Sequence, residues 1–252
     1  MKTIPAFACL GAGLAMLIAA LTAQEPTPGA GKSAKKKIVE AGAEVLPSED
    51  PLHAIHAHVC GFQFYNGQMD RQVVAHHYCA QLNEDVMQCL LYDSDKADAR
   101  LIGIEYLISA RVFATLPPEE KKLWHSHVHE VKSGELIAPG IADVAEKQLM
   151  RDLAGTYGKT WLTWQVDRGD TVPLGIPQLM MNFTEDGQVK PEILGDRDAK
   201  YGIRSSDKRH EREDLPLPQI LDGADDWQKE GAVQLDSTTV ESKTMIPTSP
   251  KK

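Results

Sequence analysis

Histidine is the residue type that is most unevenly distributed along this chain. Nine histidines occur in 252 residues, and eight of them fall between His53 and His129. Residues 123–134 read LWHSHVHEVKSG and carry histidine in alternation, at His125, His127 and His129. Imidazole binds transition metals through a neutral ring nitrogen and exchanges protons near neutral pH. The clustering therefore predicts a site that holds a metal ion or a polar ligand.

The spacing of these histidines limits how they can cooperate. In a strand, side chains two residues apart share a face, so His125, His127 and His129 would lie together. In a helix, only His125 and His129 would do so. The segment HAH, with His56 and His58, repeats the strand spacing. The repetition favours ligands that are presented by strands.

The neighbours His76 and His77 must point to opposite faces of a strand, so only one of them can join a given site. The spacing does not decide which of the two joins. A metal site needs three or four donor atoms at about 2.0–2.3 Å from the ion. The predicted ligands are His58, His77, His125 and His127, with His76 and Glu105 as alternatives.

Zinc suits mixed histidine and carboxylate ligation, and iron or copper also fits such donors. The competing interpretation is a hydrogen-bonded polar layer on a sheet, in which the histidines pair with tyrosines such as Tyr78, Tyr92 and Tyr106. Glu105 and Glu130 are the candidates for a general base, although the chain contains no complete motif such as HExxH. Two classes follow: a non-catalytic binding or lipid-associated protein, and a metal-dependent enzyme.

The elements that must position these residues follow from periodicity. Alternation of period two predicts strands, and apolar residues at helical spacing predict helices, one of them ending at Gly158. Strands joined by short connections favour an antiparallel sheet. The predicted fold class is α+β, with an antiparallel sheet of short strands and segregated helices. The predicted strands cover residues 54–65, 71–82, 84–93, 100–109 and 159–167, and the predicted helices begin within residues 115–124 and 141–158.

The two ends of the chain differ in composition from its body. Residues 1–23 carry one lysine before an uncharged run, which predicts a cleaved secretory signal, with a retained membrane anchor as the alternative. Residues 24–49 predict a flexible linker, and residues 50–203 form the expected body. Residues 204–252 contain few large apolar residues and predict a disordered polar tail. The expected localisation is secreted or periplasmic.

The charge of the chain restricts its partners. The formal net charge is −9, and the isoelectric point is about 5.5. Nucleic acid is excluded as a partner, because its binding depends on Lys and Arg that neutralise phosphates. A lipid or a small ligand remains as the expected partner. No segment after residue 23 is apolar over a length that could span a bilayer.

Removal of the predicted signal leaves Cys60, Cys79 and Cys89. An odd number allows at most one intramolecular disulfide. Each of the three lies in an apolar or aromatic run, and free cysteine is among the most buried residue types. The favoured interpretation is therefore three buried free thiols.

Four segments resemble the oil body-associated protein family. They are HHYC at residues 76–79, QCLLYDSDKADARLIGIEY at 88–106, LPPEEKKLWHSHVHEVKSG at 116–134 and YGKTWLTWQVDRGDTVPLGIPQLMM at 157–181. The family is best known from plant seed oil bodies and also occurs in microbes, and its domain is described as of unknown function. The resemblance thus implies a fold and a set of positions. The chain departs from the plant pattern in its leader, in its tail and at His129, where the family is expected to carry Tyr.

Overall fold

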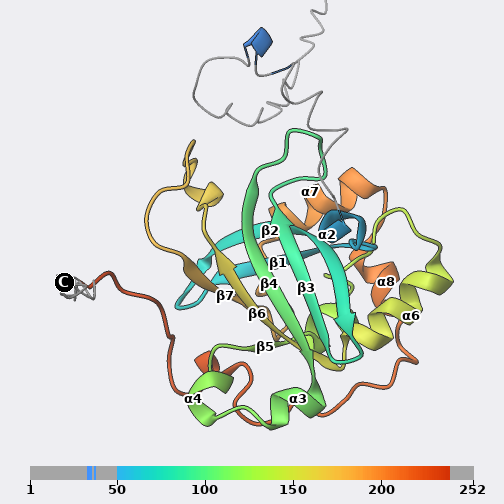
Figure 1. Ribbon diagram of the computed structural model, residues 1–252. Helices are drawn as coiled ribbons and strands as arrows, with labels where there is room; N and C mark the ends of the chain where they lie inside the picture. The colour runs from blue at the N-terminus through green and yellow to red at the C-terminus, as the bar shows by residue number, and fades with distance from the viewer. Residues whose placement is uncertain (1–32, 36, 38–49, 239–252) are drawn as a thin grey trace, which may run out of the picture.

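The computed structural model describes residues 33–35, 37 and 50–238. Its centre is an antiparallel β-barrel (Figure 1), in which strands pair in the order β4-β3-β2-β1-β7-β6 and the pairing of β4 with β6 closes the sheet. The predicted leader and nearly all of the predicted linker lie outside the described residues. The barrel strands are β1 (Ala57–Tyr65), β2 (Gln68–Asn83), β3 (Val86–Tyr92), β4 (Leu101–Ser109), β6 (Thr156–Leu162) and β7 (Gln178–Asn182).

The alternation of side chains gives each barrel strand an inner and an outer face. Val59 of β1 lies opposite His77 of β2, and Cys89 of β3 lies opposite Glu105 of β4. All four residues line one cavity inside the barrel. His76, one residue away from His77, consequently faces outward. The register of the strands therefore decides which histidines can meet.

The helices interrupt the strand order. The prediction of an α+β fold with an antiparallel sheet is confirmed, but the expected segregation of the helices is not, because several helices lie between β4 and β6. The strands are also not uniformly short, since β2 has 16 residues. The remaining elements are α2 (Asp50–His53), α3 (Ala110–Ala114), α4 (Pro118–Lys121), β5 (His125–Ser126), α5 (Val128–Ser133), α6 (Asp143–Leu153), η1 (Val166–Arg168), α7 (Pro191–Tyr201), α8 (Ser205–Glu211) and η2 (Asp226–Gln228).

Apolar packing holds these elements on the barrel. The interior cluster joins barrel residues such as Val59 and Leu91 to Met150 and Leu153 of α6. A second cluster covers the outer face of β1 and β7 beneath α7, and a third lies between the barrel and α3. Glu130 of α5 and Leu153 of α6 both line the interior cavity. The helices α5 and α6 therefore close the barrel beside that cavity.

Cys79 and Cys89 form a disulfide between β2 and β3, whereas Cys60 is a buried free thiol. The expectation of three free cysteines is wrong for this pair. The antiparallel register places Cys79 directly opposite Cys89, so that their side chains meet on the inner face. Sequence inspection could not supply that register.

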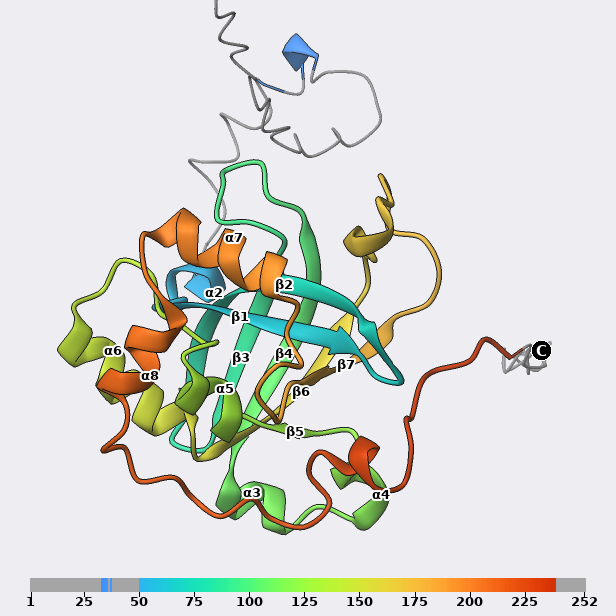
Figure 2. The ribbon, with the colours of Figure 1, turned by 180° about the vertical axis from the view of Figure 1, so that it is seen from behind.

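Of the predicted disordered tail, parts of residues 205–238 pack on the body, and residues 239–252 lie outside the described residues. The segment after α8 passes α3 and reaches α4 (Figure 2). Arg212 is 1% exposed and donates hydrogen bonds to the carbonyl groups of Val131 and Leu136, each at 2.8 Å. Trp227 packs edge-on against Phe64, with ring centroids 4.9 Å apart. Hydrogen bonds and ion pairs supply much of this docking, which explains why apolar composition did not predict it.

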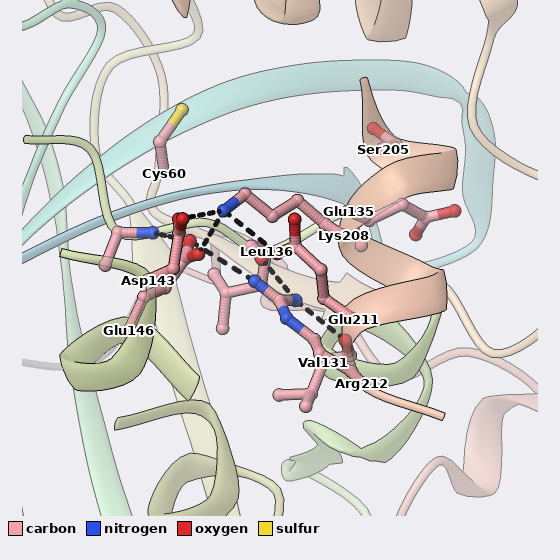
Figure 3. A network of polar contacts seen from close by, with 12 residues as sticks. Cys60, Val131, Glu135, Leu136, Asp143, Glu146, Ser205, Lys208, Glu211 and Arg212 are labelled. Carbon is pink, nitrogen blue, oxygen red and sulfur yellow. Dashed lines mark hydrogen bonds and ion pairs between the residues drawn. The ribbon is translucent and has the colours of Figure 1, made fainter. Parts of the chain in front are cut away.

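A polar network fixes α8 to α6 (Figure 3). Lys208 Nζ lies 2.7 Å from Glu146 Oε2 and 2.9 Å from Asp143 Oδ1, and Arg212 Nη2 lies 3.3 Å from Glu146 Oε1. Arg212 also bonds to a carbonyl group of α5. Because α5 begins directly after His127, the network holds the helix that follows the candidate site.

None of the helices in the described part of the chain combines the length and the apolarity needed to span a bilayer.

Candidate metal-binding site in the barrel

The carboxylate of Glu105 lies at the centre of three histidines inside the barrel. Its Oε2 atom is 2.9 Å from Nε2 of His77, and its Oε1 atom is 3.0 Å from Nε2 of His125 and 3.5 Å from Nε2 of His127. None of these four residues is more than 5% exposed. A buried charge requires partners, and the three imidazoles surround this one.

Four different elements bring these side chains together. β4 presents Glu105 inward and β2 presents His77, while His125 belongs to the two-residue strand β5 and His127 is the N-cap of α5. The segment LWHSHVHEVKSG is thus neither one strand nor one helix. It changes from strand to helix at His127, which turns His129 away from the barrel.

The docked C-terminal segment holds β5 in place. Asp225 accepts hydrogen bonds from the backbone N–H of Ser126 at 2.9 Å and from its hydroxyl at 2.6 Å. Ser126 lies between His125 and His127 in sequence. A residue of the expected tail therefore positions two residues of the site, a role that the polar composition of residues 204–252 did not indicate.

Gly158 of β6 provides the space that the site requires. A Cβ atom at this position would clash with Oε1 of Glu105 and with Nε2 of His125. Gly158 was expected to end a helix, but α6 ends at Leu153 and Gly158 lies inside a strand. Its role depends on the pairing of β6 with β4 and β5, which is not visible in the sequence.

The environment keeps Glu105 ionised. Burial by itself raises the pKa of a carboxyl group, but the attraction of His77 and hydrogen bonds from His125 and His127 outweigh burial here. Together the histidines hold the pKa of Glu105 well below its ordinary value. The group is consequently an anionic oxygen donor at neutral pH.

The hydrogen-bond partners of His127 determine its tautomer. Nδ1 of His127 lies 2.8 Å from the hydroxyl oxygen of Thr156 and 3.1 Å from its carbonyl oxygen. The hydroxyl already donates its proton to the carbonyl of Leu153 at 2.7 Å, and a carbonyl can only accept. Nδ1 therefore carries a proton, so Nε2 donates to Glu105 only in the doubly protonated ring, whereas in the singly protonated ring it presents a lone pair toward Glu105. A lone pair and a carboxylate repel each other unless a proton or a cation lies between them.

A second buried carboxyl group, that of Glu130, lies on the other side of His127. Its Oε1 atom is 4.0 Å from Nε2 of His127. Burial, reinforced by the negative charge of Glu105, raises the pKa of Glu130 to about 8. In the absence of a cation, Glu130 is therefore protonated at neutral pH.

A small cavity is lined by Glu105, His127 and Glu130. Its volume is about 20 Å³, and its polar lining also includes Gln63. The amide nitrogen of Gln63 donates to the hydroxyl of Thr160 at 3.0 Å, while its Oε1 atom has no hydrogen-bond partner among the described residues. A cavity of this size holds about one water molecule or one ion.

The geometry fits one metal ion. Donor atoms of Glu105, His125 and His127 all lie within 4.8 Å of one another. Tetrahedral zinc with bonds of about 2.0–2.1 Å separates its ligand atoms by about 3.3 Å, and the separations of 3.0 and 3.5 Å lie on either side of that value. His77 holds the other oxygen of Glu105, as an outer partner orients a metal ligand.

The structure gathers three of the four histidines that were expected at a metal site, together with Glu105. His58 is not among them. It lies on the outer face of β1, with Nε2 at 3.1 Å from Nδ1 of His76 and its ring stacked on Tyr78. The expected pocket shared by His58, His125 and His127 is not formed, because Val59, and not His58, lies on the inner face opposite His77.

The remaining candidates also point away from Glu105. His76 lies on the outer face, 3.4 Å from the hydroxyl oxygen of Tyr201, so that His77 is the inward member of the HHYC pair. His129 lies on α5, with Nε2 at 3.6 Å from Oε1 of Glu135. Neither histidine lines the interior cavity.

Replacing Glu130 by Gln should stabilise the metal-free protein more at about pH 8 than at about pH 5. The folded-state pKa of about 8 lies above the ordinary value of 4.5, so the wild-type protein loses stability as pH rises between these values, whereas the amide does not titrate. The gain should reach a few kcal/mol near pH 8 and then level off. Urea denaturation with a chelator present measures it, with the exposed Glu192→Gln as the matched variant. A gain that is constant across this range would contradict the expected burial of a neutral acid.

Comparison with known proteins finds relatives that belong to a single family. A model of the family described as protein of unknown function, DUF1264, matches residues 49–216. Oil body-associated protein 2A of Zea mays is 45% identical over 193 residues, which cover 76% of this chain and 77% of the relative. Oil body-associated protein 2C of Arabidopsis thaliana is 41% identical over 218 residues, which cover 85% and 92%. No solved structure matches the chain.

These relatives correct one expectation from the sequence. A secreted or periplasmic localisation was expected from residues 1–23, and it is wrong, because the relatives are named for their association with oil bodies. The family match also continues past residue 203, the expected end of the body, to residue 216.

Proposed function

The chain belongs to the oil body-associated protein family, and we propose that its barrel holds one divalent transition metal ion of the zinc type in a non-catalytic binding role. The ligands are Glu105, His125 and His127, and His77 orients the carboxylate. The observation that carries the proposal is the convergence of Nε2 of His125 and Nε2 of His127 on one oxygen of the buried Glu105, at 3.0 and 3.5 Å, beside a cavity that holds about one ion.

The charges around the cavity support a cation. Two carboxyl groups, Glu105 and Glu130, share this cavity, and within the described residues their ion-pair partners are histidines. A proton on His127 balances Glu105 alone while Glu130 stays protonated, whereas a divalent ion supplies charge for both carboxylates and also accepts lone pairs. Oε1 of Gln63, which has no hydrogen-bond partner in the described part of the chain, adds a further acceptor at the same cavity.

The size of the cavity favours binding over catalysis. Space for about one water molecule does not admit an organic substrate beside the ion. The enzyme alternative, with Glu105 or Glu130 as the base, requires a substrate in contact with one of these carboxyl groups. Both groups are at most 4% exposed, so the closed geometry favours a bound ion that stays in place.

Metal analysis of the purified chain tests this proposal. After removal of metal with a chelator, the chain is incubated with zinc, dialysed and analysed by mass spectrometry for metal content. The proposal expects about one zinc ion per folded chain, because burial of the ligands slows release. Zinc that stays far below one ion per chain, with the fold intact, would rule the proposal out.

Attachment to a lipid surface is a second function that the outer face of β2, β3 and β4 favours. Two adjoining hollows of about 270 and 240 Å³ lie there, and Leu52, Ile55, Tyr78 and Leu90 line both. Leu52 is 57% exposed, and Tyr106, which borders the first hollow, is 41% exposed. Exposed apolar surface of this kind marks binding sites, and the names of the relatives support lipid as the partner.

Replacing both Leu52 and Tyr106 by Asp should weaken flotation of the chain with phospholipid-coated triacylglycerol droplets by roughly tenfold, since two apolar contacts are lost. The matched control is Val144→Asp on α6, where the side chain is 85% exposed. Flotation in a density gradient measures the bound fraction. Equal flotation of the double variant and of the control would show that the outer face of β2, β3 and β4 is not the lipid contact.

A further inference from the structure

The Cys79–Cys89 disulfide lies in the wall of the same cavity as the candidate metal site. Both cysteines line that cavity together with His77 and Glu105. Cys89 lies directly opposite Glu105 in the pairing of β3 with β4. Cys79 follows His77 by two residues on β2, so the two share the inner face.

This register places Cys89 next to Glu105 on the inner face of the barrel. Directly opposed residues of an antiparallel pair have Cβ atoms about 4.5–5.5 Å apart, and their side chains extend to the same side. A cysteine thiolate is a preferred ligand of zinc, with a bond of about 2.3 Å. In the disulfide the sulfur of Cys89 is bonded to Cys79 and lacks the charge that makes thiolate a strong ligand.

We propose that the Cys79–Cys89 disulfide controls metal binding according to redox state: after reduction, Sγ of Cys89 becomes the fourth ligand of the ion bound by Glu105, His125 and His127. The inference rests on the proposed metal site and adds its fourth ligand and its regulation. The oxidised chain binds through three protein ligands, and the reduced chain binds more tightly.

The reductant is a small-molecule thiol. One thiolate of the reductant attacks a sulfur of the disulfide, the S–S bond breaks, and a second reductant thiol completes the two-electron transfer. The reductant leaves as its own disulfide, and two protons end on the sulfurs of Cys79 and Cys89. When the ion binds, Cys89 releases its proton to solvent and donates a sulfur lone pair. Cys79 and Cys89 are 2% and 4% exposed, so the reductant reaches their sulfurs when the barrel opens locally.

The third cysteine offers an internal control. Cys60 is fully buried, lies opposite the outward-facing His76, and does not line the interior cavity. A thiol at this position is free in both redox states and cannot reach the ion. Among the cysteines that the structure describes, only the Cys79–Cys89 pair can therefore produce a redox effect on metal binding.

The test compares zinc affinity of the full chain in its oxidised and its phosphine-reduced form, by competition with a chromogenic chelator. Reduction should tighten zinc binding by about tenfold or more, the scale on which a single interaction at a metal site acts. Cys79→Ser, which keeps Cys89 as a thiol, should bind tightly in both conditions, and Cys89→Ser should bind weakly in both. Cys60→Ser should respond to reduction as the wild-type chain does.

Cobalt provides a readout that does not depend on variants. Cobalt in the reduced wild-type chain should show a sulfur-to-metal charge-transfer band that is missing from the oxidised chain. Equal zinc affinity of the oxidised and the reduced chain, without that band after reduction, overturns the proposed role of Cys89. The site formed by Glu105, His125 and His127 would not be affected by this result. Failure of both forms to bind zinc overturns the proposed function as well.

Discussion

Glu105→Gln is expected to abolish stoichiometric zinc binding. The amide keeps the volume of the side chain but removes the only anionic donor among the three ligands. The expected loss of affinity is about 100-fold or more, since removal of a ligand opens the coordination shell. His127→Ala should have the same effect. The measurement is zinc content after dialysis, supported by chelator competition.

Two histidine variants serve as matched controls for this loss. His129→Ala and His58→Ala each remove an imidazole, but neither residue approaches Glu105 in the folded chain. Both variants should retain about one zinc ion per chain. Loss of zinc from His58→Ala, with retention in Glu105→Gln, would instead favour the four-histidine ligand set that was expected from the sequence.

Arg212→Ala is expected to lower the free energy of unfolding by roughly 3–5 kcal/mol, the scale for removing one partner of a buried ion pair. The substitution leaves the carbonyl groups of Val131 and Leu136 without their donor and takes a positive charge away from the buried Glu146. Because α5 is attached through the same side chain, zinc affinity should also fall. Urea denaturation followed by tryptophan fluorescence measures the change in stability.

The control for charge is Arg204→Ala. The side chain of Arg204 is 76% exposed and forms a surface ion pair with Asp207, so its removal should change stability by no more than about 0.5 kcal/mol. An Arg212→Ala variant as stable as this control would mean that the segment after α8 does not support the fold.

Local patterns in the sequence predict the strands better than they predict the site. Alternation reveals β1 to β4 because each strand has one face toward the barrel interior. The same alternation shows that His76 and His77 diverge, but not which of them points inward. That choice depends on closure of the barrel between β4 and β6, a contact between segments about fifty residues apart. His58 was assigned to the site for the same reason, since its face could not be known.

Two parts of the site had no usable signal in the sequence. Gly158 matters because β6 passes beneath Glu105 and His125, which is a property of the assembled sheet. Asp225 lies in a polar region, and its hydrogen bonds to Ser126 fix β5 from a distance of about a hundred residues in sequence. Composition describes how much apolar surface a segment can bury, but it does not describe specific hydrogen bonds to buried backbone.

The most direct test of the metal site is anomalous X-ray diffraction from crystals of the zinc-loaded chain, recorded on both sides of the zinc absorption edge. The proposed site predicts one strong peak inside the barrel, about 2.0–2.2 Å from a carboxylate oxygen of Glu105 and from the Nε2 atoms of His125 and His127. A zinc peak between His58 and His76 on the outer face, with none beside Glu105, would contradict it.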